Sequence, residues 1–194
     1  SARALGGGGY AENFTISDSL IEANEALSTA SVYGGGVIGS INTPGNNSLS
    51  RSVVRSNAAR PSSGASTHVQ GGGIAVTNFA ARLTIRDSTI SNNSATGGST
   101  SGVAIGGGVM FTGQLVMSNS TVDGNQAAGS NSYGGGLYSY GRTGLAPTSP
   151  PDNLQLFNST ISNNTSAIGG GILICSGYGQ SFSPSDIPAL CATT

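Results

Sequence analysis

Hydrophobic and polar residues alternate in short runs along this chain. In the stretch "LTIRDSTISNNSA" (83–95), Leu83 and Ile85 alternate with Thr84 and Arg86. A period of two is typical of β-strands, in which successive side chains point to opposite faces of the sheet. The chain is also rich in glycine, with 32 of 194 residues, which helices tolerate poorly. The pattern therefore predicts an all-β protein built from short strands.

The same stretch recurs along the chain. Its copies are "FTISDSLIEANEA" from Phe14, the more divergent "NSLSRSVVRSNAA" from Asn47, "LVMSNSTVDGNQA" from Leu115 and "LQLFNSTISNNTS" from Leu154. Between the copies, a triple glycine is followed by an apolar residue at 7–10, 34–37, 71–74, 106–109, 134–137 and 169–172. Glycine permits tight corners and close approach of neighbouring backbone, so each triplet is expected at a corner.

One asparagine occupies the same position in all five copies. These residues, called the Asn column below, are Asn24, Asn57, Asn93, Asn125 and Asn164. Asparagine tolerates left-handed backbone, and its amide can bond the same amide in a neighbouring coil. The column is therefore expected to lie at a corner and to fix the register between coils.

Short strands, turns and a repeat of variable length indicate a solenoid in which each copy is one coil stacked on the last. Repetition is needed because a single coil cannot bury its own apolar face. We predict a parallel β-helix of about five coils over residues 1–175, with the Asn and glycine columns at its corners. Residues 176–194 are expected to form an irregular cap or tail, and the segments 94–105 and 141–153 are expected to protrude as loops.

A second set of apolar residues follows the glycine triplets. If the first apolar residue after each triplet points inward, the next residue points outward, and these residues form an outer apolar stripe: Ile38, Ala75, Met110, Tyr138 and Leu173. A monomer seldom exposes such a surface without a partner or a covering loop. Three interpretations stay open: lateral contact or cover by the chain's own loops, stacking of carbohydrate on tyrosines including Tyr140, or a reversed inward and outward assignment.

Composition excludes some classes of partner. Charged residues are 8% of the chain and the net charge is about -1, so the concentrated positive field of a nucleic-acid surface is absent. No apolar run is long enough to span a bilayer. Cys175 and Cys191 are close enough in sequence to suggest a disulfide in an oxidising compartment, although two unrelated thiols would give the same pattern.

Candidate chemistry is sparse. Clustered charges from neighbouring coils could cleave an acidic polysaccharide or bind Ca²⁺, and the best candidate column is Asp18, Arg51, Asp87, Asn119 and Asn158. Alternation of Asp with Asn at one position instead favours side chains that bond their own backbone at turns. His68 is the single histidine and lacks a second imidazole or a nearby acid. We expect no catalytic residue, no metal site and no cofactor.

The alternation of "GGGI" or "GGGV" with "STISNN" resembles the right-handed parallel β-helix repeats of bacterial surface proteins. It is similar to the repeats of polymorphic outer-membrane proteins: Ile90 to Asn93, Val122 to Asn125 and Ile161 to Asn164 stand where that family has Phe-x-x-Asn. The chain departs from the family in carrying Ile or Val for Phe and a third glycine. The resemblance implies a right-handed coil, a secreted or cell-surface location, and a fold shared with pectin-degrading enzymes.

These features lead to one expected function and two alternatives. We expect an extracellular, non-enzymatic structural or adhesive solenoid that stacks end to end with copies of itself into a filament. Unpaired strand edges at the ends of a β-helix are what such stacking would use. The alternatives are a polysaccharide lyase or hydrolase on the same fold, and an adhesin that binds glycans.

Overall fold

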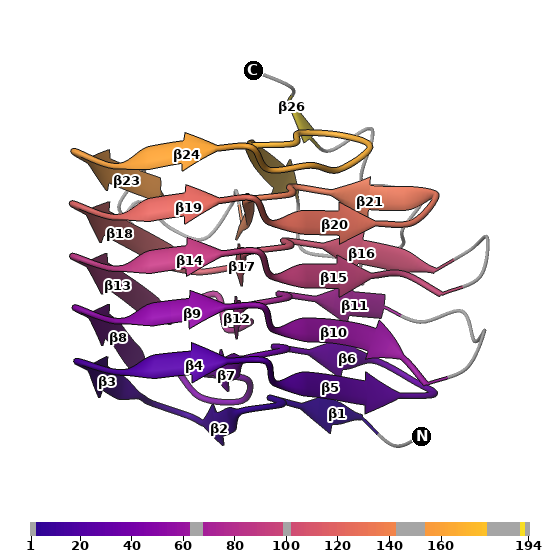
Figure 1. The fold of residues 1–194 in the computed structure, drawn as a ribbon, viewed down its shortest axis with the longest axis horizontal. Helices are drawn as coiled ribbons and strands as arrows, with labels where there is room; N and C mark the ends of the chain where they lie inside the picture. Colours follow the sequence, from indigo (N-terminus) through magenta and orange to yellow (C-terminus); the bar gives the residue numbers. More distant parts are fainter. Residues whose placement is uncertain (1–2, 63–67, 99–101, 143–153, 178–190, 193–194) are drawn as a thin grey trace.

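The computed structural model describes residues 3–62, 68–98, 102–142, 154–177 and 191–192. In this part of the chain all regular structure is β-strand. Figure 1 shows the strands lying in layers stacked one above another, with β1 (Ala4–Leu5) and β2 (Gly9–Ala11) at one end of the stack and β24 (Thr160–Ser162) and β26 (Cys191–Ala192) at the other. The protein is therefore a parallel β-solenoid, as the repeats predict.

The coils contribute strands to five sheets, named A to E here, and the last coil has no strand in sheet E. Sheet A contains β1 (Ala4–Leu5), β6 (Val32–Tyr33), β11 (His68–Gln70), β16 (Val103–Ile105) and β21 (Asn131–Tyr133). Sheet B contains β2 (Gly9–Ala11), β7 (Val37–Gly39), β12 (Ile74–Val76), β17 (Val109–Phe111), β22 (Leu137–Arg142), β25 (Ile172–Gly177) and β26 (Cys191–Ala192). Every neighbouring pair in these two sheets is parallel except β25 and β26, which are antiparallel.

The repeated stretch forms the other three sheets. Sheet C contains β3 (Thr15–Ser17), β8 (Asn46–Ser50), β13 (Arg82–Arg86), β18 (Gln114–Ser118) and β23 (Leu154–Phe157). Sheet D contains β4 (Leu20–Glu22), β9 (Val53–Arg55), β14 (Thr89–Ser91), β19 (Thr121–Asp123) and β24 (Thr160–Ser162). Sheet E contains β5 (Glu25–Ser28), β10 (Ala58–Pro61), β15 (Ser94–Thr96) and β20 (Gln126–Ala128). Four steps join the five copies, so the five expected coils make about four turns.

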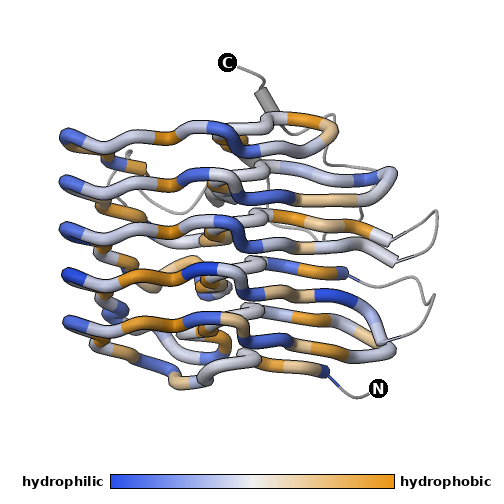
Figure 2. The backbone as a smooth tube through the Cα atoms, in the orientation of Figure 1, coloured by the Kyte–Doolittle hydropathy of each residue, from blue (hydrophilic) through white to orange (hydrophobic). Residues whose placement is uncertain are grey.

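The register of the sheets reproduces the alignment of the copies. Ile90 pairs with Val54 on one side and Val122 on the other, and Ile85 pairs with Leu49 and Met117. Equivalent residues are therefore stacked directly above one another, which Figure 2 shows as bands of like hydropathy in successive layers. The period-two pattern decides this register, because a slip by one residue would turn every apolar side chain outward.

The main hydrophobic core lies between sheets B, C and D. Leu83, Ile85, Ile90, Val109 and Phe111 are all fully buried in it. A second contact, between sheets A and E, is lined by small side chains such as Ala59, Ala95 and Ala104, together with Val32 and Val69. Alanine permits these two sheets to approach closely, so the coil is narrow on that side.

The outer apolar stripe is covered by the chain itself, but by sheet A rather than by the loops considered from the sequence. Its residues point away from the main core as predicted, but Ile38, Ala75, Met110, Tyr138 and Leu173 are each no more than 5% exposed. Met110, Tyr138 and Leu173 pack with Val103, Ile105 and Tyr133 of sheet A in a separate cluster. Sheet A lies across the outer face of sheet B because the chain turns sharply at the glycine triplets between the two sheets. At Gly134, for example, φ is +59°, and a Cβ there would come within 2.8 Å of the Tyr138 Cβ.

Two further boundaries differ from the expected ones. Strands β15 and β16 account for six of the nine described residues in the segment 94–105, so the described part of that expected loop is mainly sheet. Strand β25 continues to Gly177, two residues beyond the expected end of the solenoid at 175. The expected loop at 141–153 lies outside the described residues from position 143 on, and the expected cap lies outside them over 178–190.

Candidate functional site

The Asn column forms a ladder of hydrogen bonds that runs the length of the solenoid. In each step, the backbone N–H and the side-chain Nδ2 of one asparagine donate to Oδ1 of the asparagine in the following coil, at 2.9–3.0 Å. The Nδ2 groups of Asn57, Asn93, Asn125 and Asn164 also donate to backbone carbonyls of the preceding coil. Asn57, Asn93 and Asn125 are buried. The ladder thus satisfies polar groups inside the wall and keeps coils in register.

The left-handed corner is one residue earlier than expected. Positive φ values occur at Ala23, Ser56, Asn92, Gly124 and Asn163, each of which immediately precedes a residue of the Asn column. The asparagine itself therefore faces inward, and the preceding residue makes the turn. The ladder bonds need the amide side chain of asparagine, whereas the turn needs only a residue that adopts a left-handed backbone. The column is therefore always Asn, and the residue before it varies.

A serine ladder runs parallel to the Asn column and was not expected. Its members are Ser19, Ser52, Ser88, Ser120 and Ser159. The backbone N–H of each serine except Ser159 donates to Oγ of the serine in the following coil, at 3.1–3.3 Å. Each of the five Oγ groups donates to the carbonyl two residues before it. A serine stands at this position in all five copies, so the alignment contained the signal.

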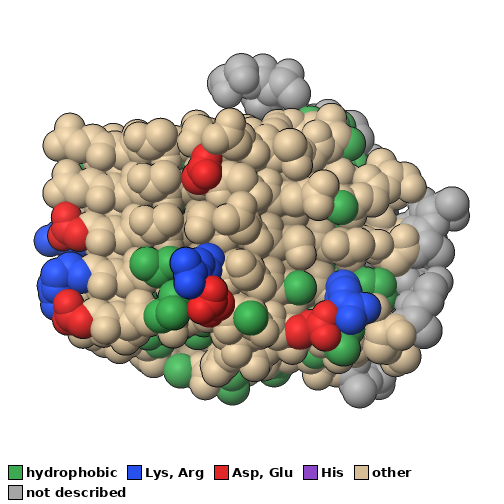
Figure 3. Space-filling model, viewed as in Figure 1, with side chains coloured by type: hydrophobic (Ala, Val, Ile, Leu, Met, Phe, Trp, Pro, Cys, Tyr) green, Lys and Arg blue, Asp and Glu red, His purple; other side chains and the backbone are tan. Residues whose placement is uncertain are grey.

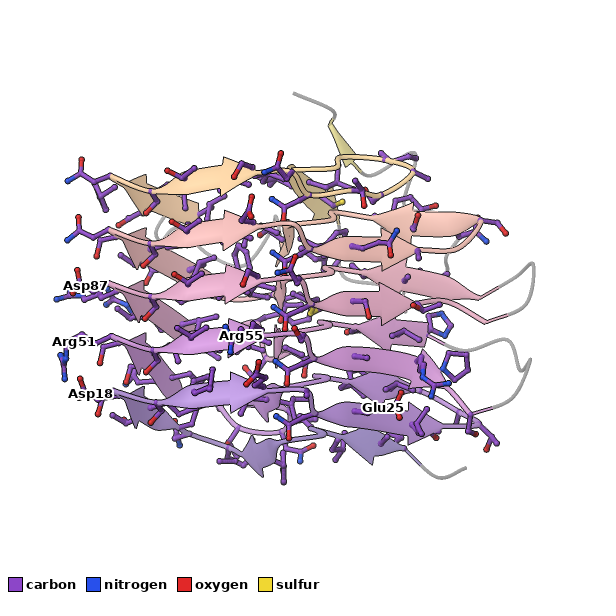
Figure 4. All side chains as sticks on the ribbon, in the orientation of Figure 1. Asp18, Glu25, Arg51, Arg55 and Asp87 are labelled. Carbon is purple, nitrogen blue, oxygen red and sulfur yellow. The ribbon has the colours of Figure 1, made fainter. Side chains whose placement is uncertain are left out.

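The candidate catalytic column is a row of turn residues. Asp18, Arg51, Asp87, Asn119 and Asn158 all have φ between 46° and 51°. Figure 4 shows Asp18, Arg51 and Asp87 above one another at one corner of the coil, pointing away from it. Arg51 donates to both carboxylate oxygens of Asp18 at 2.7 and 2.6 Å, and Asn119 Nδ2 donates to Asp87 Oδ1 at 3.1 Å. Both carboxylates are exposed and bonded to the neighbouring coil, which favours the turn interpretation.

Three ion pairs join the first coil to the second. Besides Asp18–Arg51, Glu22 pairs with Arg55 and Glu25 pairs with Arg60. Figure 3 shows acidic and basic side chains side by side on the lower coils of the face it presents. The bond from Arg51 holds the pKa of Asp18 below its ordinary value. These side chains are largely in solvent, so each pair adds little to stability.

His68 lies in β11, where it pairs with Val103 in the neighbouring strand. Within the described residues, no group of three or more His, Cys, Asp or Glu side chains is placed to hold a metal ion. The same residues contain no helix long and apolar enough to cross a membrane. Cys175 is buried and disulfide-bonded, and its partner in the β25–β26 register is Cys191, the one other cysteine of the chain.

Two concave surfaces remain as candidate binding sites. The first, the A–B groove, has a volume of about 490 Å³ and lies where sheet A meets the outer face of sheet B. It is lined by Met110 and Tyr138 of the outer apolar stripe and by Tyr140, which follows Tyr138 in β22. The second, the N-terminal hollow, has a volume of about 520 Å³ and opens on the first coil between Phe14, Ile16 and Ile21.

No protein-family model matches this chain, and no curated protein or solved structure shows significant similarity to it. The parallel solenoid is therefore established by the structure alone. The resemblance to polymorphic outer-membrane protein repeats stays a prediction.

Proposed function

We propose that this protein is a non-enzymatic structural solenoid that stacks end to end with copies of itself. The observation that carries the proposal is the complementarity of its two end coils. In every step of the Asn ladder, a coil donates to Oδ1 of the coil that follows. Among the described residues, Asn24 Oδ1 receives no donor and the Asn164 N–H has no acceptor. A second copy placed above the last coil would bring its Asn24 over Asn164 and continue the ladder.

The two ends of the serine ladder are complementary to each other in the same direction as the two ends of the Asn ladder. The N–H of Ser159 lacks an acceptor among the described residues, and Ser19 Oγ receives no N–H from them. Stacking in register would join these two groups by the bond that already links Ser120 to Ser159. Two independent ladders would thus close in one arrangement.

The apolar surfaces of the end coils support the same arrangement. Ile16 and Ile21 line the N-terminal hollow, and Leu156 and Ile161 occupy the corresponding columns in the last coil. Leu156 is 37% exposed, whereas its counterparts Ile85 and Met117 in the middle coils are fully buried. A head-to-tail contact would bury these side chains as the inner coils bury theirs. Since such a contact is heterologous, repetition produces a filament.

Strand β26 limits where the contact can form. It covers the edge of β25 at Ile174 and Cys175, but β23 and β24 are paired on one side only in the described structure. The proposed contact therefore uses the edges of sheets C and D. The disulfide of Cys175 is consistent with an oxidising compartment, so we extend the proposal to an extracellular or cell-surface location.

Electron microscopy and sedimentation over a range of concentrations test the proposal. We expect linear assemblies whose repeat equals the height of the solenoid. Ile16→Lys would place a charge in the N-terminal hollow and should leave monomers, whereas Thr84→Lys, on the outer side of a middle coil, should assemble as the wild type does. Dispersed wild-type monomers at every concentration, or equal assembly of Ile16→Lys, would overturn the proposal.

A further inference from the structure

The A–B groove has the character of a small-molecule site. Its deep wall is made of apolar residues from sheets A and B, among them Ile105 and Met110, and both are almost completely buried. Phe79 is at its rim and is 42% exposed, with its ring centroid 5.8 Å from that of Tyr140 and the two rings inclined at 57°. A groove of this volume with aromatic and aliphatic walls is of the size that proteins use to enclose ligands.

Two hydroxyl groups in the lining have no hydrogen-bond partner among the described residues. They are Tyr138 OH and Thr112 Oγ1, on side chains that are 1% and 6% exposed. A buried polar atom without a partner is uncommon, because it has lost its bonds to water without replacing them. Burial also raises the pKa of Tyr138 well above its ordinary value, so its hydroxyl is a neutral group able both to donate and to accept.

The charge of the lining restricts the ligand. Arg3 is the one charged residue among the described residues that line the groove, and it is exposed. An ion bound against Met110 and Ile105 would lose its hydration without gaining a buried partner of opposite charge. The occupant must therefore be uncharged in its buried part.

We propose that the A–B groove binds an uncharged, ring-containing small molecule that carries a hydroxyl group, with the ring against Phe79, Tyr140 and Met110 and the hydroxyl bonded to Tyr138 and Thr112. A sugar would place several hydroxyl groups against the apolar side chains of Ile105 and Met110 and leave them without partners, so the lining favours a ligand with one hydroxyl over the carbohydrate stacking considered from the sequence. The site is independent of the proposed assembly, because its lining is on the side of the coils and not at the unpaired edges of β23 and β24.

Calorimetric titration with 2-naphthol and with naphthalene tests both halves of the proposal. The two probes share a neutral ring system and differ in the hydroxyl. We expect saturable binding of both, with 2-naphthol about fivefold tighter, as one net hydrogen bond provides. Tyr138→Phe combined with Thr112→Val should abolish that preference while keeping the affinity for naphthalene. Gln70→Trp, which places a large side chain at the rim of the groove, should weaken both probes.

Tyr10→Phe is the matched control, since it removes a tyrosine hydroxyl at the first coil, outside the A–B groove, and should leave both affinities unchanged. Circular dichroism spectra of all variants establish that they are folded. Absence of saturable binding, or an unchanged preference in the double variant, would overturn the proposal. Saturable binding of methyl β-glucopyranoside in place of 2-naphthol would also overturn it, and would assign the groove to a sugar.

Discussion

The backbone N–H and the side-chain Nδ2 of Asn57 donate to a single atom, Oδ1 of Asn93, at 3.0 and 2.9 Å. The two residues are 36 positions apart in sequence and lie in successive coils. Asn93 repeats the arrangement with Asn125, so each asparagine both gives and receives bonds within the wall of the solenoid.

Asn93→Ala should destabilise the protein by about 3 kcal/mol, because it leaves the Asn57 N–H buried without an acceptor and removes a donor from the Val54 carbonyl. Asn92→Ala is the matched control: Asn92 is exposed, and alanine already occupies the equivalent left-handed position at Ala23. Its cost should be about 1 kcal/mol. Urea unfolding measures both losses, and equal losses would contradict a dominant role for the ladder.

Gly72→Ala should lower stability by about 3 kcal/mol, since the added Cβ would collide with the backbone of Gly107 in the next coil and of Ser94. Gly9→Ala tests a position where the nearest atom to an added Cβ is Val37 Cγ2 at 3.4 Å. That variant should lie within about 0.5 kcal/mol of the wild type. Thermal unfolding compares the stabilities of the two variants. If Gly72→Ala is as stable as the wild type, the coils are less closely packed at this corner than the structure shows.

Asp87→Ala should cost about 1 kcal/mol more than Asp87→Gly, because φ at this position is +49° and glycine adopts that conformation without a Cβ penalty. Both variants lose the same bond from Asn119, so their difference isolates the backbone. Chemical denaturation provides the comparison. If Asp87→Ala is as stable as Asp87→Gly, the left-handed backbone at this column of residues has no measurable cost for a side chain, and the turn interpretation loses its support.

The same two variants separate a turn from a catalytic carboxylate. We expect wild-type protein, with or without Ca²⁺, to release no unsaturated or reducing sugar from acidic polysaccharides. Chromatography of the products is the measurement. Release by the wild type that is lost in both Asp87 variants would replace the structural proposal with the polysaccharide-degrading alternative.

Glu12 should make stability depend on pH in the acid range. Its carboxylate accepts bonds from Tyr10 and from the loop at Asn42 and Thr43, which lower its pKa to about 2. Because the folded pKa is lower than the unfolded one, the stabilisation is complete above about pH 4.5 and is lost as the pH falls toward about 2. The free energy of unfolding should therefore fall more steeply for the wild type than for Glu12→Gln across this window. Parallel curves for the two proteins would refute the effect.

Much of this fold could be predicted from the sequence, because the repeats record the register directly. Ile90 and Asn93 were expected as core and corner, and they are buried core and ladder respectively. The cover over Tyr138 could not be predicted. The alternation of apolar and polar residues indicates on which face of a strand a side chain lies, but it does not indicate what packs against that face. The packing over Tyr138 depends on how sheet A turns across sheet B at the glycine triplets.

The direction of the Asn ladder has a consequence for how the protein forms. Each asparagine donates to an oxygen that belongs to the coil after it, so Asn24 depends on Asn57, and Asn57 on Asn93. During synthesis, or emergence through a pore from the N-terminus, a coil cannot complete its own bonds until its successor has arrived. Folding would then trail emergence of the chain by one coil, so the growing end would never hold more than one coil with incomplete bonds.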